Sequence, residues 1–422
     1  MRKVLLSLLV AMGLPTAAWC ADGDTFKMKI AEGVEMTFKV ISEEEKTCQV
    51  GEGWYSCIED YTGPVTVPST ANGYTVTCLG EMALAGGDWS DVHVTGVTLP
   101  ETITALGDYA FENSDICELV IPNSVTEFGM YMFAGCEKLQ TVTLPQGMTK
   151  IPNYLYSQCP IKSYTIQSHI KEIGECAFVN SGLESIVVPM TVEKVGSGAF
   201  AGCENLTHAE ILNPNIELED EIFASTSLTS FTFPEGIKTV PWRMFKECKN
   251  LSSVKLSSNV ESIEEDAFEK CESLESIDLP NGLKTIGVEA FAGSGLKSIT
   301  LPNSLENIDW YAFSWCNQLT EIQSLIVEPF EIDKSVFDSG DSGLDIYETA
   351  TLIVPEGSEE LYKNTPAWSM FYNLVTTGIS RPEMQTAAGQ HFTLDGRKAA
   401  QGQRGLQIVK QADGRVVKTF VR

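Results

Sequence analysis

The chain has 422 residues, 43% of them hydrophobic, which is enough apolar material for a large buried core. Its 57 acidic and 29 basic residues give a formal net charge of −28. This charge repels the phosphates of nucleic acid and of anionic lipid, so both are excluded as expected partners. The charge is unevenly spread: residues 381–422 contain eight Lys/Arg against three Asp/Glu, and this local positive excess predicts a separate C-terminal module.

Residues 1–20 have the order of a secretory signal peptide. A basic start at Arg2 and Lys3 precedes an apolar run, Val4 to Leu14, that is too short to span a bilayer. Ala18-Trp19-Cys20 fits the small-x-small cleavage rule and predicts a mature chain that begins near Ala21. Cys20 also leaves a lipoprotein open, although Trp19 stands where a lipobox requires a small residue. No later stretch approaches the ~20 apolar residues of a membrane helix, so we expect export without a membrane span.

Residues 21–78 are expected to form a β-rich N-terminal cap. Phe26 to Ile30 and Met36 to Val40 alternate polar and apolar residues, as half-buried strands do. A cap is needed because the open end of a repeat array would otherwise expose its core. Cys48 and Cys57 flank a glycine-rich turn, Gly51 to Gly53, and are either a candidate disulfide or two free thiols.

Internal repeats dominate the chain from residue 79 to residue 340. A motif of the form Ala-Phe-x-x-Cys recurs at intervals of 22 to 24 residues. Its aromatic position, called the repeat aromatic below, is occupied by Phe111, Phe133, Tyr156, Phe178, Phe200, Phe223, Phe245, Phe268, Phe291, Phe313 and Phe337. Periods of about 20 to 29 residues with ordered leucines indicate a leucine-rich-repeat solenoid.

One repeat unit illustrates the predicted coil. Ser276 to Pro280 alternates polar and apolar residues, and its proline ends the strand because it has no N–H for a ladder. Leu283 to Ile286 is a second extended piece, and Gly287 turns the chain. Ala290-Phe291-Ala292 is expected to form a brief helical turn that directs its ring into the core. Neighbouring coils must stack, because one coil is too small to bury its apolar side alone.

Six cysteines follow the same period. Three residues after the repeat aromatic lie Cys136, Cys159, Cys203, Cys248, Cys271 and Cys316, and the equivalent places elsewhere hold Ser114, Ser181, Thr226 and Ser294. A position that accepts Cys, Ser or Thr requires a small group that can hydrogen-bond in a tight turn. Stacked strands lie ~4.8 Å apart, whereas the Cβ atoms of a disulfide lie ~3.8 Å apart. We therefore interpret these cysteines as buried, reduced ladder residues rather than metal ligands or nucleophiles.

The strings Ile286 to Phe291 and Leu301 to Leu305 resemble the BspA-type leucine-rich repeats of surface proteins from Gram-negative anaerobes. The resemblance extends from about Leu79 to Val354, with departures such as Tyr156 in place of Phe. It implies an α+β repeat solenoid: a right-handed array of 22–23-residue coils, each with short strands and a short helical turn. It further implies a cell-surface or secreted protein that binds host or bacterial macromolecules.

The C-terminal end is expected to be closed by a capping repeat over residues 341–377. Thr351 to Val354 is predicted to be a strand, and Ser358 to Phe371 an amphipathic helix whose aromatic residues form a helical cap: Tyr362, Trp368 and Phe371. Residues 378–422 are predicted to be a linker and a small β tail, in which Asp413-Gly414 is a hairpin signal. The tail resembles the C-terminal sorting domains of the type IX secretion route, which implies delivery to the cell surface. A β tail that packs on the last coil is the alternative.

No catalytic, cofactor or metal site is predicted. Gly340 to Gly343 reads Gly-Asp-Ser-Gly, as in chymotrypsin-like nucleophiles, but none of the four histidines stands in a context that would supply the base. The chain has no His-Glu-x-x-His, Cys-x-x-Cys, phosphate-loop or dinucleotide motif. Acidic runs such as Glu264 to Asp266 are interpreted as a solvated face. We therefore expect a non-enzymatic protein without a cofactor.

Two surfaces are candidates for binding a protein or glycan. The outward residues of the first strands form a sheet of roughly 50 Å over ten coils, and its candidate residues are Thr143, Thr165, Thr232, Lys255, Asp278 and Thr300. The second surface consists of aromatic residues near the repeat aromatic, of types favoured at interfaces: Tyr109, Tyr131, Tyr154, Trp242, Trp310, Tyr311 and Trp315. Threonine also favours any wet sheet and aromatic residues also pack between coils, so a purely structural role stays open for both sets.

The leading functional hypothesis is an adhesin-like protein at the outer cell surface or outside the cell. The alternative is a structural or scaffold component of the cell envelope without a host ligand. Exposed aromatic patches would favour the adhesin, whereas a uniformly polar surface with self-association would favour the scaffold.

Overall fold

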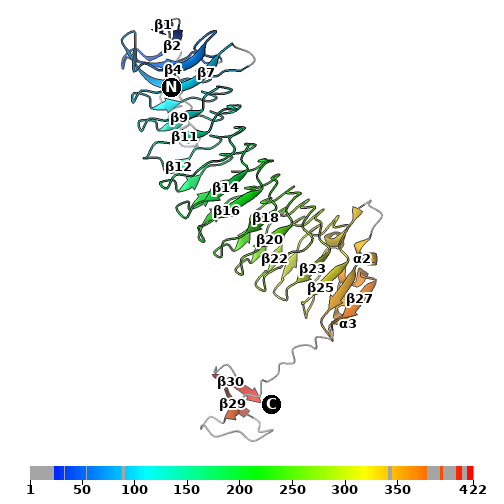
Figure 1. Ribbon diagram of the computed structural model, residues 1–422. Coiled ribbons are helices and arrows are strands. Elements are labelled where there is room, and N and C mark those ends of the chain that lie inside the picture. The colour runs from blue at the N-terminus through cyan, green and yellow to red at the C-terminus, as the bar shows by residue number, and fades with distance from the viewer. Residues whose placement is uncertain are drawn as a thin grey trace, which may run out of the picture.

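The computed structural model describes residues 23–377, except residues 33, 54, 88–90 and 341–344, together with three strands between residues 390 and 421. The predicted signal peptide and residues 341–343 of the Gly-Asp-Ser-Gly motif lie outside the described residues. Figure 1 shows the chain from its blue N-terminal strands to its orange elements as an elongated stack of coils. The predicted repeat solenoid is confirmed.

Antiparallel strands lead into the repeats at the N-terminal end. β1 (Thr25–Ala31), β2 (Val34–Ser42) and β3 (Thr47–Val50) pair antiparallel in chain order. β3 pairs parallel with β6 (Tyr74–Leu79), which also pairs with β5 (Thr70–Ala71). Met36 and Phe38 on β2 are fully buried and belong to the same hydrophobic core as the repeats. The core of the array therefore continues into these strands.

Each coil contributes up to two short strands, and these form two rows along the array. The first row contains β4 (Thr62–Thr66), β7 (His93–Thr98), β9 (Glu118–Val120), β11 (Thr141–Thr143), β14 (Ser185–Val188), β16 (His208–Ile211), β18 (Ser230–Thr232), β20 (Ser253–Lys255), β23 (Ser298–Leu301) and β25 (Glu321–Ser324). The second row contains β8 (Ala105–Leu106), β10 (Glu127–Phe128), β12 (Lys150–Ile151), β13 (Glu172–Ile173), β15 (Lys194–Val195), β17 (Glu217–Leu218), β19 (Thr239–Val240), β21 (Ser262–Ile263), β22 (Thr285–Ile286) and β24 (Asn307–Ile308). Pairing between coils is parallel and in register, so Ile151, Ile173 and Val195 stand in one column.

A column of aromatic rings forms the centre of the core. From Phe111 to Phe337 each repeat aromatic stacks on the next, with ring centroids 4.9–5.9 Å apart. All of these rings are fully buried, and the ring of Tyr156 occupies the same position in the column as the phenylalanine rings of the other coils. Stacked aromatic pairs add about 0.5–1.5 kcal/mol each beyond the burial of their area. The column therefore ties every coil to both of its neighbours.

The helical turn predicted around the repeat aromatic is wrong. The residues two before and two after the ring adopt the left-handed region instead, as Glu221 (φ 56°) and Ser225 (φ 56°) do around Phe223. With this backbone conformation, N–H groups of the turn point at the next coil. The N–H of Phe223 donates to Met244 O (3.1 Å), and that of Ser225 donates to Lys246 O (2.7 Å). A helical turn would use these donors within its own coil, whereas the observed turn adds a third ladder of hydrogen bonds between coils.

The C-terminal end is built more from strands than was predicted. β26 (Thr351–Val354) and β27 (Asn373–Thr376) continue the first row beyond β25. Between the strands lie only short helical pieces: η2 (Lys334–Phe337), α2 (Ile346–Thr349), α3 (Glu359–Asn364) and η4 (Trp368–Met370). Trp368 is buried and its indole N–H donates to Phe330 O (2.9 Å), while the buried Tyr362 hydroxyl donates to Ile326 O (2.9 Å). Hydrogen-bonded aromatic side chains therefore hold this end together, and the helix expected from Ser358 to Phe371 covers only six residues.

Three further strands form an antiparallel sheet in the tail. Its order is β28 (Gln390–Phe392), β29 (Gly405–Lys410) and β30 (Val416–Val421). β29 and β30 pair on either side of Asp413-Gly414, as the hairpin signal predicts. Within the described parts of the chain, no helix has the length and apolar character that crossing a bilayer requires.

Candidate functional site

The first-row sheet presents the predicted polar face. Thr143, Thr232 and Thr300 lie on strands with their side chains exposed, and Lys255 does so on β20. The alternate residues of these strands are buried, which follows from the two-residue period of a strand. Thr165 and Asp278 are also exposed, but their coils lack a first-row strand. The face is therefore mostly polar, with Val120 and Val187 as exposed apolar residues, and it is interrupted rather than one continuous sheet.

Three of the candidate tyrosines form a stack beside the core. The ring centroids of Tyr109 and Tyr131 lie 5.3 Å apart, and those of Tyr131 and Tyr154 are also 5.3 Å apart. All three residues are only half exposed, and each occupies the left-handed position two residues before the repeat aromatic. The Tyr154 hydroxyl donates to the Glu175 carboxylate (3.2 Å). These contacts between coils favour packing as the main role of this stack.

Three of the other four aromatic candidates are more exposed and lie in one coil, whereas Trp242 is partly buried in a different coil. Trp310 is 60% exposed, Tyr311 38% and Trp315 45%. The rings of Tyr311 and Trp315 stack with centroids 6.2 Å apart, while the repeat aromatic Phe313 between them is fully buried. Large exposed apolar groups gathered in one place are typical of an interaction surface. We call Trp310, Tyr311 and Trp315 the aromatic patch.

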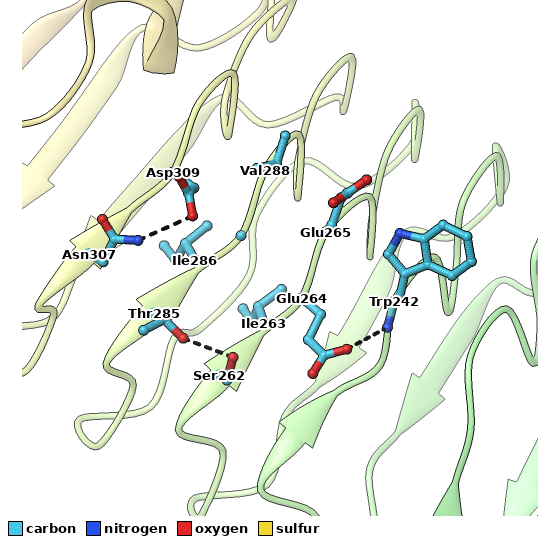
Figure 2. A pocket seen from close by; sticks show the side chains of 11 residues that line it. Trp242, Ser262, Ile263, Glu264, Glu265, Thr285, Ile286, Val288, Asn307 and Asp309 are labelled. Carbon is cyan, nitrogen blue, oxygen red and sulfur yellow. Dashed lines mark hydrogen bonds between the residues drawn. The ribbon is translucent and has the colours of Figure 1, made fainter.

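A groove lies beside the second-row strands and is lined by residues of four successive coils. Figure 2 shows its lining residues, among them Trp242, Glu264, Glu265, Val288 and Asp309. Its volume is about 640 Å³. Trp242 and Trp310 share a register, three residues before their repeat aromatic, so Trp310 continues the row that Trp242 begins. We call this cleft the acidic groove.

The depth of the acidic groove follows from one glycine. Glu264, Gly287 and Asp309 occupy the same repeat position in three successive coils. A Cβ atom on Gly287 would lie 2.8 Å from backbone atoms of Glu264 and Glu265, so a side chain at this position would require the backbone to shift, and glycine leaves the space free. The groove is therefore open between two carboxylates.

Hydrogen bonds hold the two outer carboxylates of the groove. Glu264 accepts from the backbone N–H of Trp242 (3.2 Å). Asp309 accepts from the N–H of Trp310 (3.3 Å) and from the side-chain amide of Asn307 (3.3 Å). Figure 2 shows the Asn307–Asp309 pair and the Glu264–Trp242 pair on opposite sides of the view, and the Thr285 hydroxyl donating to that of Ser262 (2.8 Å). The carboxylates are thus oriented before any ligand arrives.

A network of ion pairs borders the groove on the turn side. The Arg243 guanidinium lies 4.0 Å from the centre of the Trp242 ring and is paired with Asp266 (2.9 Å) and Glu221 (3.3 Å). Lys246 pairs with Asp266 (3.0 Å) and also with Glu269. Asp266 is buried, so the interpretation of Glu264 to Asp266 as a solvated face is wrong at its last residue.

Asp266, Glu269 and Glu289 form a cluster of carboxylates that could reach one metal ion, because their ligand atoms lie within 4.8 Å of one another. Lys246, Arg243 and Lys270 already neutralise two of the three. Burial, together with Asp266 and Glu269, raises the pKa of Glu289. The chemistry of the cluster is therefore that of a closed ion-pair network.

The repeat cysteines hydrogen-bond between coils. Cys203 Sγ donates to the carbonyl of Phe178 (3.0 Å) and lies 3.3 Å from the Ser181 hydroxyl, and Cys136, Cys248 and Cys316 repeat this arrangement. Burial raises the pKa of Cys203 to about 11. Cys48 and Cys57, the candidate disulfide pair, are buried free thiols in the structure.

The sequence analysis placed Trp242 and Trp310 at the same repeat position but did not predict the groove. The signal was present, because the 22–23-residue period places Glu264, Gly287 and Asp309 in one column. A column of Glu, Gly and Asp does not reveal by itself that the glycine opens a cleft. The left-handed turns that set the direction of each side chain were also not predicted.

The sequence of the chain matches the model of a known protein family. A model of the "BspA type Leucine rich repeat region" matches residues 88–184, 171–272 and 239–347, in six copies. No curated protein matches the chain.

One solved structure shares the fold, and two others are similar to the chain. The pneumococcal vaccine antigen PcpA is 18% identical, with a TM-score of 0.50, over 85% of this chain and 99% of that one. A leucine-rich repeat protein from Bacteroides ovatus is 24% identical (TM-score 0.49; 71% and 94% covered), and a leucine-rich cell surface protein from Faecalibacterium prausnitzii is 22% identical (0.48; 82% and 99%). Because the family model covers more than half of the residues and the coils stack as it requires, this chain belongs to the BspA-type leucine-rich repeat family.

Proposed function

We propose that this protein is exported to the cell surface, where it binds a protein or glycan partner without catalysing a reaction. The observation that carries the proposal is the aromatic patch. Three large aromatic side chains are exposed in a coil whose core is complete without them, because Phe313 alone fills the repeat position. Tryptophan and tyrosine supply much of the binding energy at protein interfaces.

Two features at the ends of the chain support export. The order of residues 1–20 is that of a signal peptide, and the tail from residue 378 resembles a type IX sorting domain. Expression in a host that has this secretion route should place the full-length protein on the surface. A variant that ends at Thr377 should then accumulate in the periplasm, as fractionation and surface proteolysis would report; unchanged surface display would contradict the sorting role.

Binding is tested with the purified protein on immobilised extracellular-matrix proteins and on a glycan array. The double variant Trp310→Ala/Trp315→Ala removes both tryptophans of the patch. Tyr55→Ala is its control, since Tyr55 is 76% exposed but lies near the N-terminal strands, far along the chain from the patch. We expect saturable binding that the double variant reduces at least tenfold and the control leaves unchanged. Absence of binding to both panels, or an equal loss in both variants, would contradict an adhesin that uses this patch.

A second candidate function, an envelope scaffold, is favoured by the C-terminal end. Leu361, Met370, Tyr372 and Val375 are exposed there, and β27 is the last strand of its sheet. Exposed apolar residues beside an edge strand favour association with a second copy. Light scattering across a range of protein concentrations tests this: dimers that Tyr372→Glu dissociates would support the scaffold, and a monomer at all concentrations would exclude it.

A further inference from the structure

The acidic groove carries negative charge that no described side chain neutralises with an ion pair. Its lining contains Glu264, Glu265 and Asp309 and no lysine or arginine. Among the residues that the structure describes, none forms an ion pair with these three carboxylates. The neighbouring Asp266, by contrast, is paired with two cations. The carboxylates of the groove are thus available to a basic ligand, whereas the neighbouring Asp266 is already paired within the protein.

Trp242 lines the groove, and Trp310 directly follows the lining residue Asp309 in the chain; aromatic rings of this type can receive a cation. The guanidinium of Arg243 already lies over the Trp242 ring, which shows within this chain the contact that a basic ligand would make. Trp310, three coils further along the same row, has an indole that is 60% exposed. A lysine or arginine side chain could therefore contact an aromatic face and a carboxylate together.

We propose that the acidic groove binds an extended, lysine- or arginine-rich peptide segment of a partner protein. The row from Trp242 to Trp310 spans three coil steps of ~4.8 Å, or roughly 15 Å, which matches four or five residues of extended chain at ~3.3 Å each. A neutral glycan could stack on the indoles but would leave the three carboxylates without counter-charge. The inference rests on the proposed binding function and names the chemistry of its partner.

The test measures binding of fluorescein-labelled octalysine to the purified protein by fluorescence anisotropy at physiological ionic strength. The groove variant is Glu264→Gln/Glu265→Gln/Asp309→Asn, which removes three charges and retains oxygen acceptors for the N–H groups of Trp242 and Trp310. The matched control removes the same charge from three exposed carboxylates outside the groove: Glu101→Gln/Glu137→Gln/Glu204→Gln. Because both variants change the net charge equally, general attraction to an acidic chain is weakened equally in both.

We expect the groove variant to lose at least tenfold in affinity and the control less than twofold. Trp310→Ala should weaken binding about threefold in the otherwise native protein. Equal losses in the two triple variants would show general electrostatic attraction and overturn the inference. Binding of neutral chitohexaose that Trp310→Ala abolishes, with no groove-dependent octalysine binding, would assign a glycan and also overturn it. In that case binding to the matrix or glycan panel would still stand, so the proposed function and this inference fail separately.

Discussion

The substitution Gly129→Ala tests the close stacking of the coils most directly. Gly129 is buried in the turn after β10, and its N–H donates to the carbonyl of Leu106 in the preceding coil (2.7 Å). An added Cβ atom would lie 2.3 Å from the carbonyl carbon of Gly107 and 2.4 Å from the backbone nitrogen of Asp108. Both distances are about 1 Å shorter than the ~3.5 Å of an ordinary contact. The atoms that it meets are backbone, so no side chain can rotate away.

The expected loss of stability follows from these distances. Overpacking that side chains can absorb costs about 1–3 kcal/mol, and here the two coils must separate. The hydrogen bond from Gly129 to Leu106 would then be strained, which adds about 1 kcal/mol. We expect a total of about 4 kcal/mol. Gly147→Ala is the matched control, because its Cβ would meet nothing within 4 Å; it should be neutral or stabilising by up to about 1 kcal/mol.

Urea unfolding followed by circular dichroism gives the change in stability, and hydrogen exchange measured by mass spectrometry locates it. The second measurement matters because a repeat array can open in parts instead of unfolding all at once. In Gly129→Ala, exchange should rise first in the coils from residue 107 to residue 156. If the two alanine variants show the same urea midpoint and the same exchange, the close stacking of the coils at this position is refuted.

Three further outcomes follow from the turns. Ser225 has a left-handed φ of 56° where other coils have Gly202 and Gly293. Relief of ~1–2 kcal/mol of strain exceeds the ~0.5–1 kcal/mol entropy cost of glycine, so Ser225→Gly should raise the free energy of unfolding by about 0.5 kcal/mol. The urea midpoint should rise with it, and a lower midpoint would contradict this. Because burial raises the pKa of Glu289 above its ordinary 4.5, its ionisation costs stability as pH rises above 4.5. Glu289→Gln should therefore raise Tm at pH 7 and not at pH 3.5; no pH dependence would refute it. At pH 8 a thiol reagent should modify the exposed Cys117 within minutes and the buried Cys203 only after unfolding, and equal rates in tryptic peptides would contradict the ladder of buried thiols.

The core could be predicted because its residues repeat. Phe200 and Phe223 predict one another through the period alone, and in-register stacking then places them in one column. The turn could not be predicted this way, because its left-handed positions accept almost any residue. Asn180 and Gly202 carry the sequence signal for a positive φ, but Glu247 takes the same conformation without it. The hydrogen bonds between coils compensate there for the unfavourable local preference, and such compensation depends on the neighbouring coil.

The C-terminal end illustrates a second limit. Trp368 and Tyr362 were expected to lie on one amphipathic helix, and both are buried as that pattern requires. The helix ends at Asn364, however, because the chain must turn at Ala367, which has a φ of 62°, to bring β27 alongside β26. Periodicity alone identified the buried residues, while the pairing of distant strands decided the backbone between them.

Two columns of residues differ in a way that bears on the proposed binding function: the column of repeat aromatics, and the column three residues before it in each coil. The column of repeat aromatics holds only Phe and Tyr, since a change of volume in a closed stack is felt by both neighbouring coils. Three residues earlier, the same coils hold Trp242, Glu265, Val288 and Trp310, and no packing rule accounts for this variety. A tryptophan that is 60% exposed contributes little to the core, yet it lies at the end of a row beside three carboxylates that have no ion-pair partner in the described part of the chain. Side chains that the fold does not require, gathered beside a cleft that one glycine opens, are better explained by a partner than by stability.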